Sequence, residues 1–235
     1  MSVDLQAIIF DMDGLMLDTE RIALRVLAEA AQSLGYPWRE EIGLAMVGLN
    51  SRDSDVVVRK HLGLDYSADH LREAFSARYE IVIATEIIPL KPGLLELLDW
   101  VESRSLVKAI ATSTHKSRAL FKLNRTGIAP YFDIVVGGDE VKQGKPAPEI
   151  FLAAAARLGV DPNNCLVLED SAPGVRAALA AGMQVIMVPD MLMPAPEVLA
   201  LGHPICISLF EAKQLIEKIF STQISARAYA NESLV

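Results

Sequence analysis

Short apolar segments recur along the chain, and most of them are followed by a helical pattern of hydrophobic and polar positions. The segments are QAIIFD (6–11), VKAIAT (107–112), DIVV (133–136), CLVLE (165–169), QVIMV (184–188) and, more weakly, ICI (205–207). Their apolar positions are continuous instead of alternating, which is typical of strands buried on both faces. Helices between such strands form parallel crossover units. The pattern therefore predicts an α/β fold, with a Rossmann-like parallel sheet that carries helices on both faces.

One long stretch interrupts this alternation, because residues 18–87 contain no strand-like segment. Helical patterns fill it, among them ERIALRVLAEAAQSLG (20–35) and SADHLREAFSARYEIVIA (67–84). We therefore predict an all-helical cap domain over 18–87, inserted into a discontinuous core domain formed by 1–17 and 88–220. The last residues, 221–235, lack clear periodicity, and we expect them to form a loosely attached C-terminal tail.

Length, composition and charge narrow the function classes. The chain has 235 residues, 51% of them hydrophobic, and a chain of this size buries roughly 70% of its extended surface without needing disulfides. Cys165 and Cys206 lie in apolar segments, so we expect buried thiols in a reducing compartment, the cytoplasm. The net charge of −8 argues against nucleic acid or an anionic membrane as a partner, since both attract basic surfaces. We also expect no membrane span and no signal peptide.

Polar and charged residues stand where the predicted strands end. They are Asp11 and Asp13 after the first strand, Thr112 and Ser113 after the second, Lys145 in the loop after the third, and Glu169 and Asp170 at the fourth. Any one of them alone has an ordinary explanation as a turn, a helix cap or a surface charge. Ligands of open parallel sheets bind at the carboxyl ends of the strands. The coincidence of all of them at that edge therefore indicates a functional site.

The crowded carboxylates predict a metal. At an effective dielectric of 20, like charges about 4 Å apart repel by about 4 kcal/mol, so Asp11, Asp13, Glu169 and Asp170 together require a cation. A site that combines oxygen ligands with waters and a substrate oxygen favours Mg²⁺ over Ca²⁺. Mg²⁺ and Lys145 could together neutralise a phosphate group.

A phosphate group would also find neutral donors at this edge of the sheet. The Thr112 hydroxyl and the backbone N–H groups after it, from Ser113 onwards, could hold a phosphate oxygen at the start of a helix. One aspartate of the first strand end would then attack phosphorus, and the other would move the proton.

Four segments carry a family resemblance. They are DMDGLMLDTE (11–20), TS (112–113), GKPAPEIF (144–151) and LEDSAPGVRAALAAG (168–182), and they resemble the four motifs of the haloacid dehalogenase (HAD) superfamily, in the branch with a helical cap after the first strand. The resemblance implies that Asp11 is the nucleophile and a Mg²⁺ ligand, and that Asp13 is the general acid/base whose backbone carbonyl also reaches Mg²⁺. It further implies phosphate ligands at Thr112, Ser113 and Lys145, and metal ligands at Glu169 and Asp170.

The branch resemblance also suggests a substrate class. Dehalogenases proper lack the second aspartate of the first motif, and Asp13 is present here, so dehalogenation is not expected. IFDMDGLMLDTER (9–21) and the segment 165–190 are most similar to pseudouridine-5′-phosphatase-like and sugar-phosphate phosphatases. This implies a Mg²⁺-dependent phosphatase that hydrolyses a small phosphorylated metabolite, a sugar phosphate or a nucleoside 5′-monophosphate such as pseudouridine 5′-phosphate, through an aspartyl phosphate. We expect a monomer, with Arg52 of the cap as a candidate substrate contact.

Two alternatives remain. The β-phosphoglucomutases are similar in all four motifs, but they carry a histidine ten positions beyond the acid/base aspartate, where an ungapped count reaches Ala23 in this chain. A receiver-like phosphoacceptor module also combines an aspartate cluster, Mg²⁺, a threonine and a lysine on a parallel sheet, but it lacks a helical insertion after the first strand. Hydrolysis of a phosphate ester is therefore the favoured interpretation.

Overall fold

The chain divides into two compact units, one formed by Met1–Leu17 with Leu90–Val235 and the other by Asp18–Pro89. The computed structural model describes residues 4–47, 51–63 and 66–232, with the backbone alone for 51–53 and 224–232. We name the first the sheet unit and the second the helical unit.

The sheet unit is built on parallel strands in the order β3-β2-β1-β4-β5. The strands are β1 (Ala7–Phe10), β2 (Val107–Ala111), β3 (Val135–Val136), β4 (Cys165–Glu169) and β5 (Gln184–Met187). Every residue of β1 is buried, because this central strand has a neighbour on both edges and helices over both faces. The parallel α/β fold predicted from the continuous apolar segments is confirmed.

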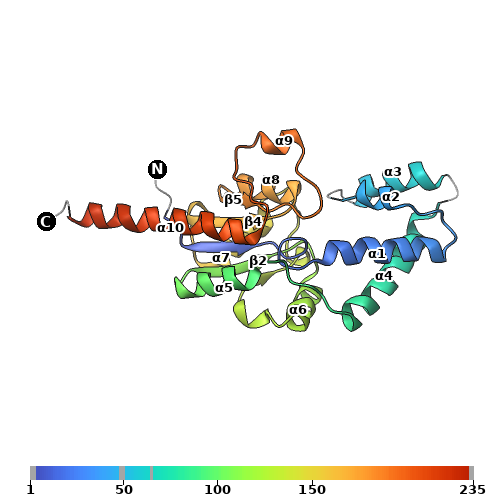
Figure 1. Ribbon diagram of the computed structural model, residues 1–235, viewed down its shortest axis with the longest axis horizontal. Coiled ribbons are helices and arrows are strands. Elements are labelled where there is room, and N and C mark those ends of the chain that lie inside the picture. Colours follow the sequence, from blue (N-terminus) through green and yellow to red (C-terminus); the bar gives the residue numbers. More distant parts are fainter. Residues whose placement is uncertain (1–3, 48–50, 64–65, 233–235) are drawn as a thin grey trace. The chain divides into compact units, whose positions relative to one another are not determined.

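Helices cover both faces of this sheet (Figure 1). They are α5 (Leu94–Ser103), α6 (Lys116–Arg125), α7 (Glu149–Leu158), α8 (Ala172–Ala180), α9 (Pro196–Leu199) and α10 (Leu209–Glu232). Phe151 of α7 and Val175 of α8 pack in one core cluster with Ala7 and Ile9 of β1. Side chains of a strand alternate between its two faces, so Phe10 belongs to the other face, where its ring meets the Phe132 ring edge-on at 5.6 Å.

Short 3-10 helices lie in the connections of the sheet unit: Ala129–Tyr131, Gly138–Glu140 and Pro162–Asn164. The second of these follows β3 directly and carries Asp139 and Glu140. Both expected core thiols, Cys165 and Cys206, are buried and free, and burial raises the pKa of each to about 11. These thiols are therefore protonated and inert near neutral pH.

Two predicted elements differ from the structure. The weak strand at 205–207 is reduced to an isolated parallel bridge between Ile205 and Met187, and Ile207 is 82% exposed. The expected tail from residue 221 onwards instead continues α10 to Glu232. Gln223, inside this segment, is buried, and its Oε1 accepts from the Leu5 backbone N–H at 2.9 Å. This contact attaches the helix to the start of the first strand.

The helical unit consists of α1 (Thr19–Ser33), α2 (Glu40–Leu44), α3 (Ser51–Leu62) and α4 (Ala68–Thr85). Its own core cluster contains Ala30, Ala31, Ile42, Val58, Tyr66 and Leu71. The unit begins and ends at neighbouring backbone positions, because the Asp18 N–H donates to Pro89 O at 2.9 Å. Just outside it, Leu17 and Leu90 form an antiparallel bridge within the sheet unit. The insertion thus leaves and re-enters the sheet unit at one place.

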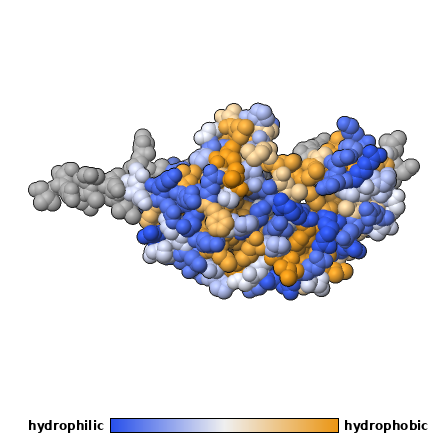
Figure 2. Space-filling model, in the orientation of Figure 1, coloured by the Kyte–Doolittle hydropathy of each residue, from blue (hydrophilic) through white to orange (hydrophobic). Residues whose placement is uncertain are grey.

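The surface of the sheet unit is mixed in polarity. Figure 2 shows hydrophobic residues at the position of α9 and in further patches elsewhere on the same face. Leu192 and Met193 in the loop before α9, and Leu199 within it, are exposed. This loop follows β5, so it belongs to the carboxyl edge of the sheet, the edge at which the candidate site lies.

Candidate active site

The central strand leads directly into the candidate site. Asp11 follows β1, and its backbone N–H donates to Leu168 O at 3.0 Å, so its position is fixed by the ladder of the sheet. Met12 is fully buried, and the next residues make a turn in which the Gly14 N–H donates to Leu17 O at 2.9 Å. Gly14 has φ +86°, which glycine adopts without strain. A side chain there would also lie 2.2 Å from Oδ2 of Asp170, so the turn and Asp170 are in close contact.

Lys145 lies between two carboxylates at the centre of the site. Its Nζ donates to Asp11 Oδ1 at 2.5 Å, to Glu169 Oε1 at 2.6 Å and to Ala111 O at 3.2 Å. It also stands 4.9 Å from the centre of the Phe151 ring. Burial lowers the pKa of Lys145, but the Asp11 and Glu169 carboxylates outweigh it and raise that pKa above its usual range. The lysine is therefore charged and provides one fixed cation.

The carboxylate cluster fits a second cation. Burial raises the pKa of Asp11 to about 7, against the opposing effect of Lys145, which shows how costly its charge is without further compensation. Asp11, Glu169 and Asp170 each offer an oxygen, and these oxygens all lie within 4.8 Å of one another. Hard carboxylate oxygens are the ligands that Mg²⁺ prefers. The residues present thus fit the divalent metal that the motifs imply.

Glu169 is fully buried and satisfied on both oxygens. Its Oε1 accepts from Lys145, while its Oε2 accepts from the backbone N–H of Ser171 at 2.7 Å and from the Ser171 hydroxyl at 2.9 Å. The Ser171 hydroxyl in turn caps α8 by accepting from the Gly174 N–H at 3.2 Å. Glu169 therefore joins Lys145 to the start of α8.

The predicted phosphate ligands follow β2. Thr112 is buried, its N–H donates to Val136 O at 3.0 Å, and its hydroxyl accepts from the Thr114 N–H at 3.1 Å. Ser113 is exposed. The bond from Lys145 to Ala111 O brings the lysine to the end of the same strand. The structure thus assembles β1, β2, β4 and the loop with Lys145 at one edge of the sheet.

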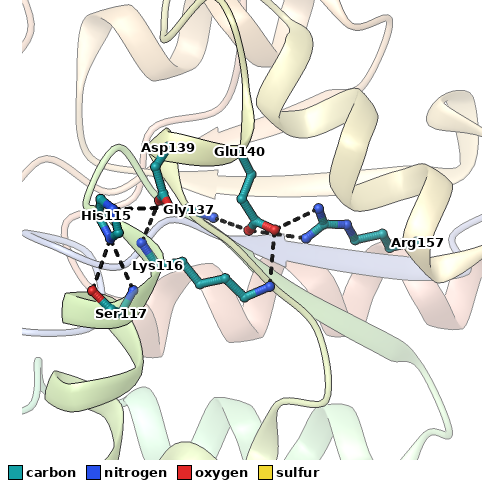
Figure 3. A network of polar contacts seen from close by, with 7 residues as sticks. All are labelled: His115, Lys116, Ser117, Gly137, Asp139, Glu140 and Arg157. Atoms are coloured by element: carbon teal, nitrogen blue, oxygen red, sulfur yellow. Dashed lines mark hydrogen bonds and ion pairs between the residues drawn. The ribbon is translucent and has the colours of Figure 1, made fainter.

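A second polar network holds the loop after β3 against the start of α6 (Figure 3). Glu140 accepts from Arg157 at 2.9 Å, from Lys116 Nζ at 3.1 Å and from the Gly137 N–H at 3.0 Å. Asp139 accepts from the backbone N–H of Lys116 at 2.6 Å. The Arg157 guanidinium, with the other donors, lowers the pKa of Glu140 to about 2. This network fixes the segment that follows Thr112 and Ser113.

Sequence reasoning missed two partners of Asp13, namely Thr114 and Lys122. A signal for Lys122 was present, because it falls in the apolar stripe of α6 that includes Ala119 and Leu123. A lysine in such a stripe needs a buried partner. Thr114 carried no comparable signal, since a threonine before a helix is an ordinary cap.

The remaining predicted contact cannot be placed. Arg52 lies on α3, but its side chain is outside the described residues. Among 4–47, 51–63 and 66–232, no helix combines the length and the apolar character needed to cross a bilayer.

Known proteins are similar to this chain in both sequence and fold. The family model described as haloacid dehalogenase-like hydrolase matches residues 8–188. A "Phosphorylated carbohydrates phosphatase" of Thermotoga maritima is 36% identical over 180 residues, which cover 77% of this chain and 83% of that protein. A Drosophila melanogaster protein named "Probable pseudouridine-5'-phosphatase" is 37% identical over 193 residues, covering 77% of this chain and 80% of its own.

A solved structure shows that the similarity extends to the fold. A crystal structure of β-phosphoglucomutase from Clostridium difficile superposes with a TM-score of 0.71 at 26% identity, covering 94% of this chain and 99% of that one. The family match over residues 8–188 includes the strand ends that carry Asp11, Thr112 and Asp170 and the loop that carries Lys145. The chain therefore belongs to the haloacid dehalogenase-like hydrolase family, as an enzyme of the phosphatase class.

Proposed function

We propose that this phosphatase is Mg²⁺-dependent and hydrolyses a small phosphorylated metabolite through an aspartyl phosphate on Asp11. The observation that carries the proposal is the position of the Asp11 carboxylate. It stands at the end of the central strand, 2.5 Å from the Lys145 ammonium and within the cluster that includes Asp170. A carboxylate approaches a phosphate dianion only if that charge is neutralised, and cations are present or accommodated on both sides.

Each residue has a separate task in the two steps. In the first, a carboxylate oxygen of Asp11 bonds to phosphorus, the bond from phosphorus to the ester oxygen breaks, and Asp13 gives that oxygen a proton, so that an alcohol leaves. In the second, Asp13 takes a proton from water, the resulting hydroxide oxygen bonds to phosphorus, and the bond to Asp11 breaks. Inorganic phosphate leaves and Asp11 is restored.

The phosphate group requires fixed donors during both steps. We assign Lys145, the Thr112 hydroxyl and the Ser113 backbone N–H to this role. Asp11, Glu169, Asp170 and the backbone carbonyl of Asp13 would hold Mg²⁺, which when bound offsets the negative charge of the phosphate. The second carboxylate oxygen of Asp11 is the one that Lys145 does not hold, and it is the better placed to attack.

The substrate class rests on the relatives. One is named for phosphorylated carbohydrates and another for pseudouridine 5′-phosphate, so we propose a sugar phosphate or a nucleoside 5′-monophosphate. Phosphomutase activity is the second candidate, since a β-phosphoglucomutase has the same fold. At the position of the mutase histidine this chain has Ala23, on α1, and its methyl group cannot move a proton. Hydrolysis therefore remains favoured.

One experiment tests these assignments together. Phosphate release is measured over a panel of sugar phosphates and nucleoside monophosphates, with Mg²⁺, with EDTA, and with the Asp11→Asn variant. We expect hydrolysis that stops in EDTA, returns with Mg²⁺, and falls at least ~10³-fold in Asp11→Asn, which keeps the shape but removes the nucleophile. Substantial turnover by pure Asp11→Asn, or full activity without metal, would refute the mechanism. Multiple-turnover conversion of β-glucose 1-phosphate to glucose 6-phosphate, faster than phosphate release, would favour the mutase.

A further inference from the structure

The carboxylate of Asp13 accepts hydrogen bonds from Lys122 of α6 and from Thr114 of the loop before that helix. The Lys122 Nζ donates to Asp13 Oδ1 at 2.6 Å, and the Thr114 hydroxyl donates to Asp13 Oδ2 at 2.7 Å. Both donors come from the segment of β2, its following loop and α6, so the rigid end of the sheet places them. Each oxygen of Asp13 thus has a separate partner.

Lys122 is an unusual residue for this position. It is 5% exposed, although a buried ammonium is costly unless a charged partner compensates it. It lies on the buried stripe of α6 beside Leu123, where an apolar residue would pack without that cost. Retaining a charged lysine here is explained by what its Nζ contacts, which is the predicted acid/base Asp13.

We propose that Lys122 is a positioning residue for proton transfer by Asp13, an inference that rests on the proposed phosphatase function. An ammonium donates hydrogen bonds and cannot accept them. The proton that Asp13 carries therefore belongs on Oδ2, while Oδ1 stays the acceptor of Lys122. The Thr114 hydroxyl next to Oδ2 can either donate or accept, so it suits both states of the carboxyl group.

This arrangement assigns one oxygen to each task. During ester cleavage the proton leaves Oδ2 for the departing ester oxygen as the bond from phosphorus to that oxygen breaks. During hydrolysis Oδ2 takes a proton from the attacking water. Lys122 keeps the carboxyl plane from rotating between the two transfers, so its loss should impair proton transfer more than phosphate binding.

The test separates steps that need a proton from one that does not. p-Nitrophenolate leaves without protonation, whereas an alkoxide from a metabolite ester requires it. In Lys122→Met, which keeps the length of the side chain but removes the donor, we expect rapid mixing with p-nitrophenyl phosphate to give a burst of about one nitrophenolate per enzyme. The burst rate should stay within ~10-fold of wild type, and the later turnover should fall ~100-fold because water activation still needs Asp13.

With the best alkyl ester of the substrate panel, the same variant should show no burst and a kcat lowered ~100-fold, with KM changed less than ~3-fold. Lys122→Arg should restore part of the rate. The matched control is Lys108→Met, because the side chain of Lys108 is also shielded and pairs with Glu102 at 3.1 Å, at the opposite end of β2. That control should keep both kinetic phases.

Two results would overturn the inference: a kcat of Lys122→Met within ~3-fold of wild type on the alkyl ester, or an equal loss of burst and turnover on both substrates. If Lys122→Met melts below the assay temperature, Lys122→Leu, which also lacks a donor, is measured by the same criteria. Failure of the wild type to release phosphate from any ester would refute the proposed function instead, so the two failures are distinguishable.

Discussion

At the scale of single residues, the candidate active site depends on a glycine that packs directly against a buried carboxylate. Gly174 lies at the start of α8, and a Cβ atom there would stand 1.7 Å from Oε1 of Glu169. Glu169 itself is fully buried and bonded to Lys145 and Ser171. The lysine, the carboxylate and the first turn of α8 therefore form one packed unit, in which none can shift alone.

This packing predicts the effect of Gly174→Ala. Alanine favours a helix over glycine by about 1 kcal/mol, but a 1.7 Å approach cannot be relieved without moving Glu169 or α8. We expect the clash to outweigh the propensity, with a lower melting temperature and a loss of phosphate release of ~100-fold or more, because Lys145 moves with Glu169. Gly43→Ala is the matched control, since its Cβ would come no closer than 3.2 Å to the end of the Leu24 side chain and 3.7 Å to the Trp38 ring. An active, equally stable Gly174→Ala enzyme would contradict the packing argument.

The sequence allowed us to predict site residues that directly follow a predicted strand. It did not reveal residues that reach the site only through the packing of a helix. Asp11 and Asp170 could be placed because each follows an apolar strand directly. Thr114 and Lys122 could not be linked to Asp13, because their proximity depends on how α6 packs at the end of β2. The roles assigned to Asp11, Asp13, Thr112 and Lys145 stay predictions until tested by kinetics.

At the scale of elements, strands were predicted well where burial leaves little choice. β4 matches its predicted range, since both of its faces and both edges are covered. The segment 205–207 failed as a strand because it meets the sheet at Met187 alone. The segment from residue 221 was predicted to be a loose tail but continues α10 to Glu232, because the tertiary contact between Gln223 and Leu5 is not visible in helical periodicity.

The polar network around Glu140, which joins the loop after β3 to α6 and α7, predicts how the stability of the fold depends on pH. The pKa of Glu140 is lowered from its ordinary 4.5 to about 2 by Arg157 and the other donors. A carboxylate whose folded pKa lies below the unfolded one stabilises the fold above the unfolded pKa, and this contribution is lost as pH falls towards 2. We expect Glu140→Gln to lower the free energy of unfolding by about 1 kcal/mol at pH 7. The loss is small because solvent screens the pair of Glu140 and Arg157.

The measurement is urea unfolding of wild type and Glu140→Gln from pH 7 down to pH 3. The difference in unfolding free energy should be constant above about pH 5 and shrink below it. Glu217→Gln is a suitable control, because Glu217 pairs with Lys213 one turn away on α10, at 2.7 Å. A difference that grows on acidification would mean that Glu140 is not stabilised as its ionised form.

At the scale of the whole molecule, the helical unit is an insertion with its own core. Its two ends are joined by the hydrogen bond from the Asp18 N–H to Pro89 O, and within the sheet unit Leu17 and Leu90 form an antiparallel bridge. We propose that the predicted core and cap have different tasks: the sheet unit supplies the catalytic groups, and the helical unit selects the ester.

Exchange of the insertion tests that proposal. A chimera that replaces Asp18–Pro89 with the corresponding segment of a relative should keep slow turnover of p-nitrophenyl phosphate, because the proposed catalytic groups lie in the sheet unit. Its ranking of metabolite esters should change towards that of the donor protein. The measurement is kcat/KM over the substrate panel, with folding checked by thermal melting. An unaltered ranking in a folded chimera would place selection within the sheet unit.

The central place of β1 also has a consequence for biosynthesis. Ala7–Phe10 pairs with Val107–Ile110 on one side and with Cys165–Leu168 on the other, so β1 is synthesised well before either of its partner strands. Closing such long loops slows folding, although the entropic cost grows only with the logarithm of loop length. A helical unit that folds early would shorten the first of these loops, since its two ends lie together. The newly made chain thus acquires the carboxylate cluster around Asp11 only after Asp170 has been synthesised, so catalytic competence cannot precede the completion of β4 and the residue that follows it.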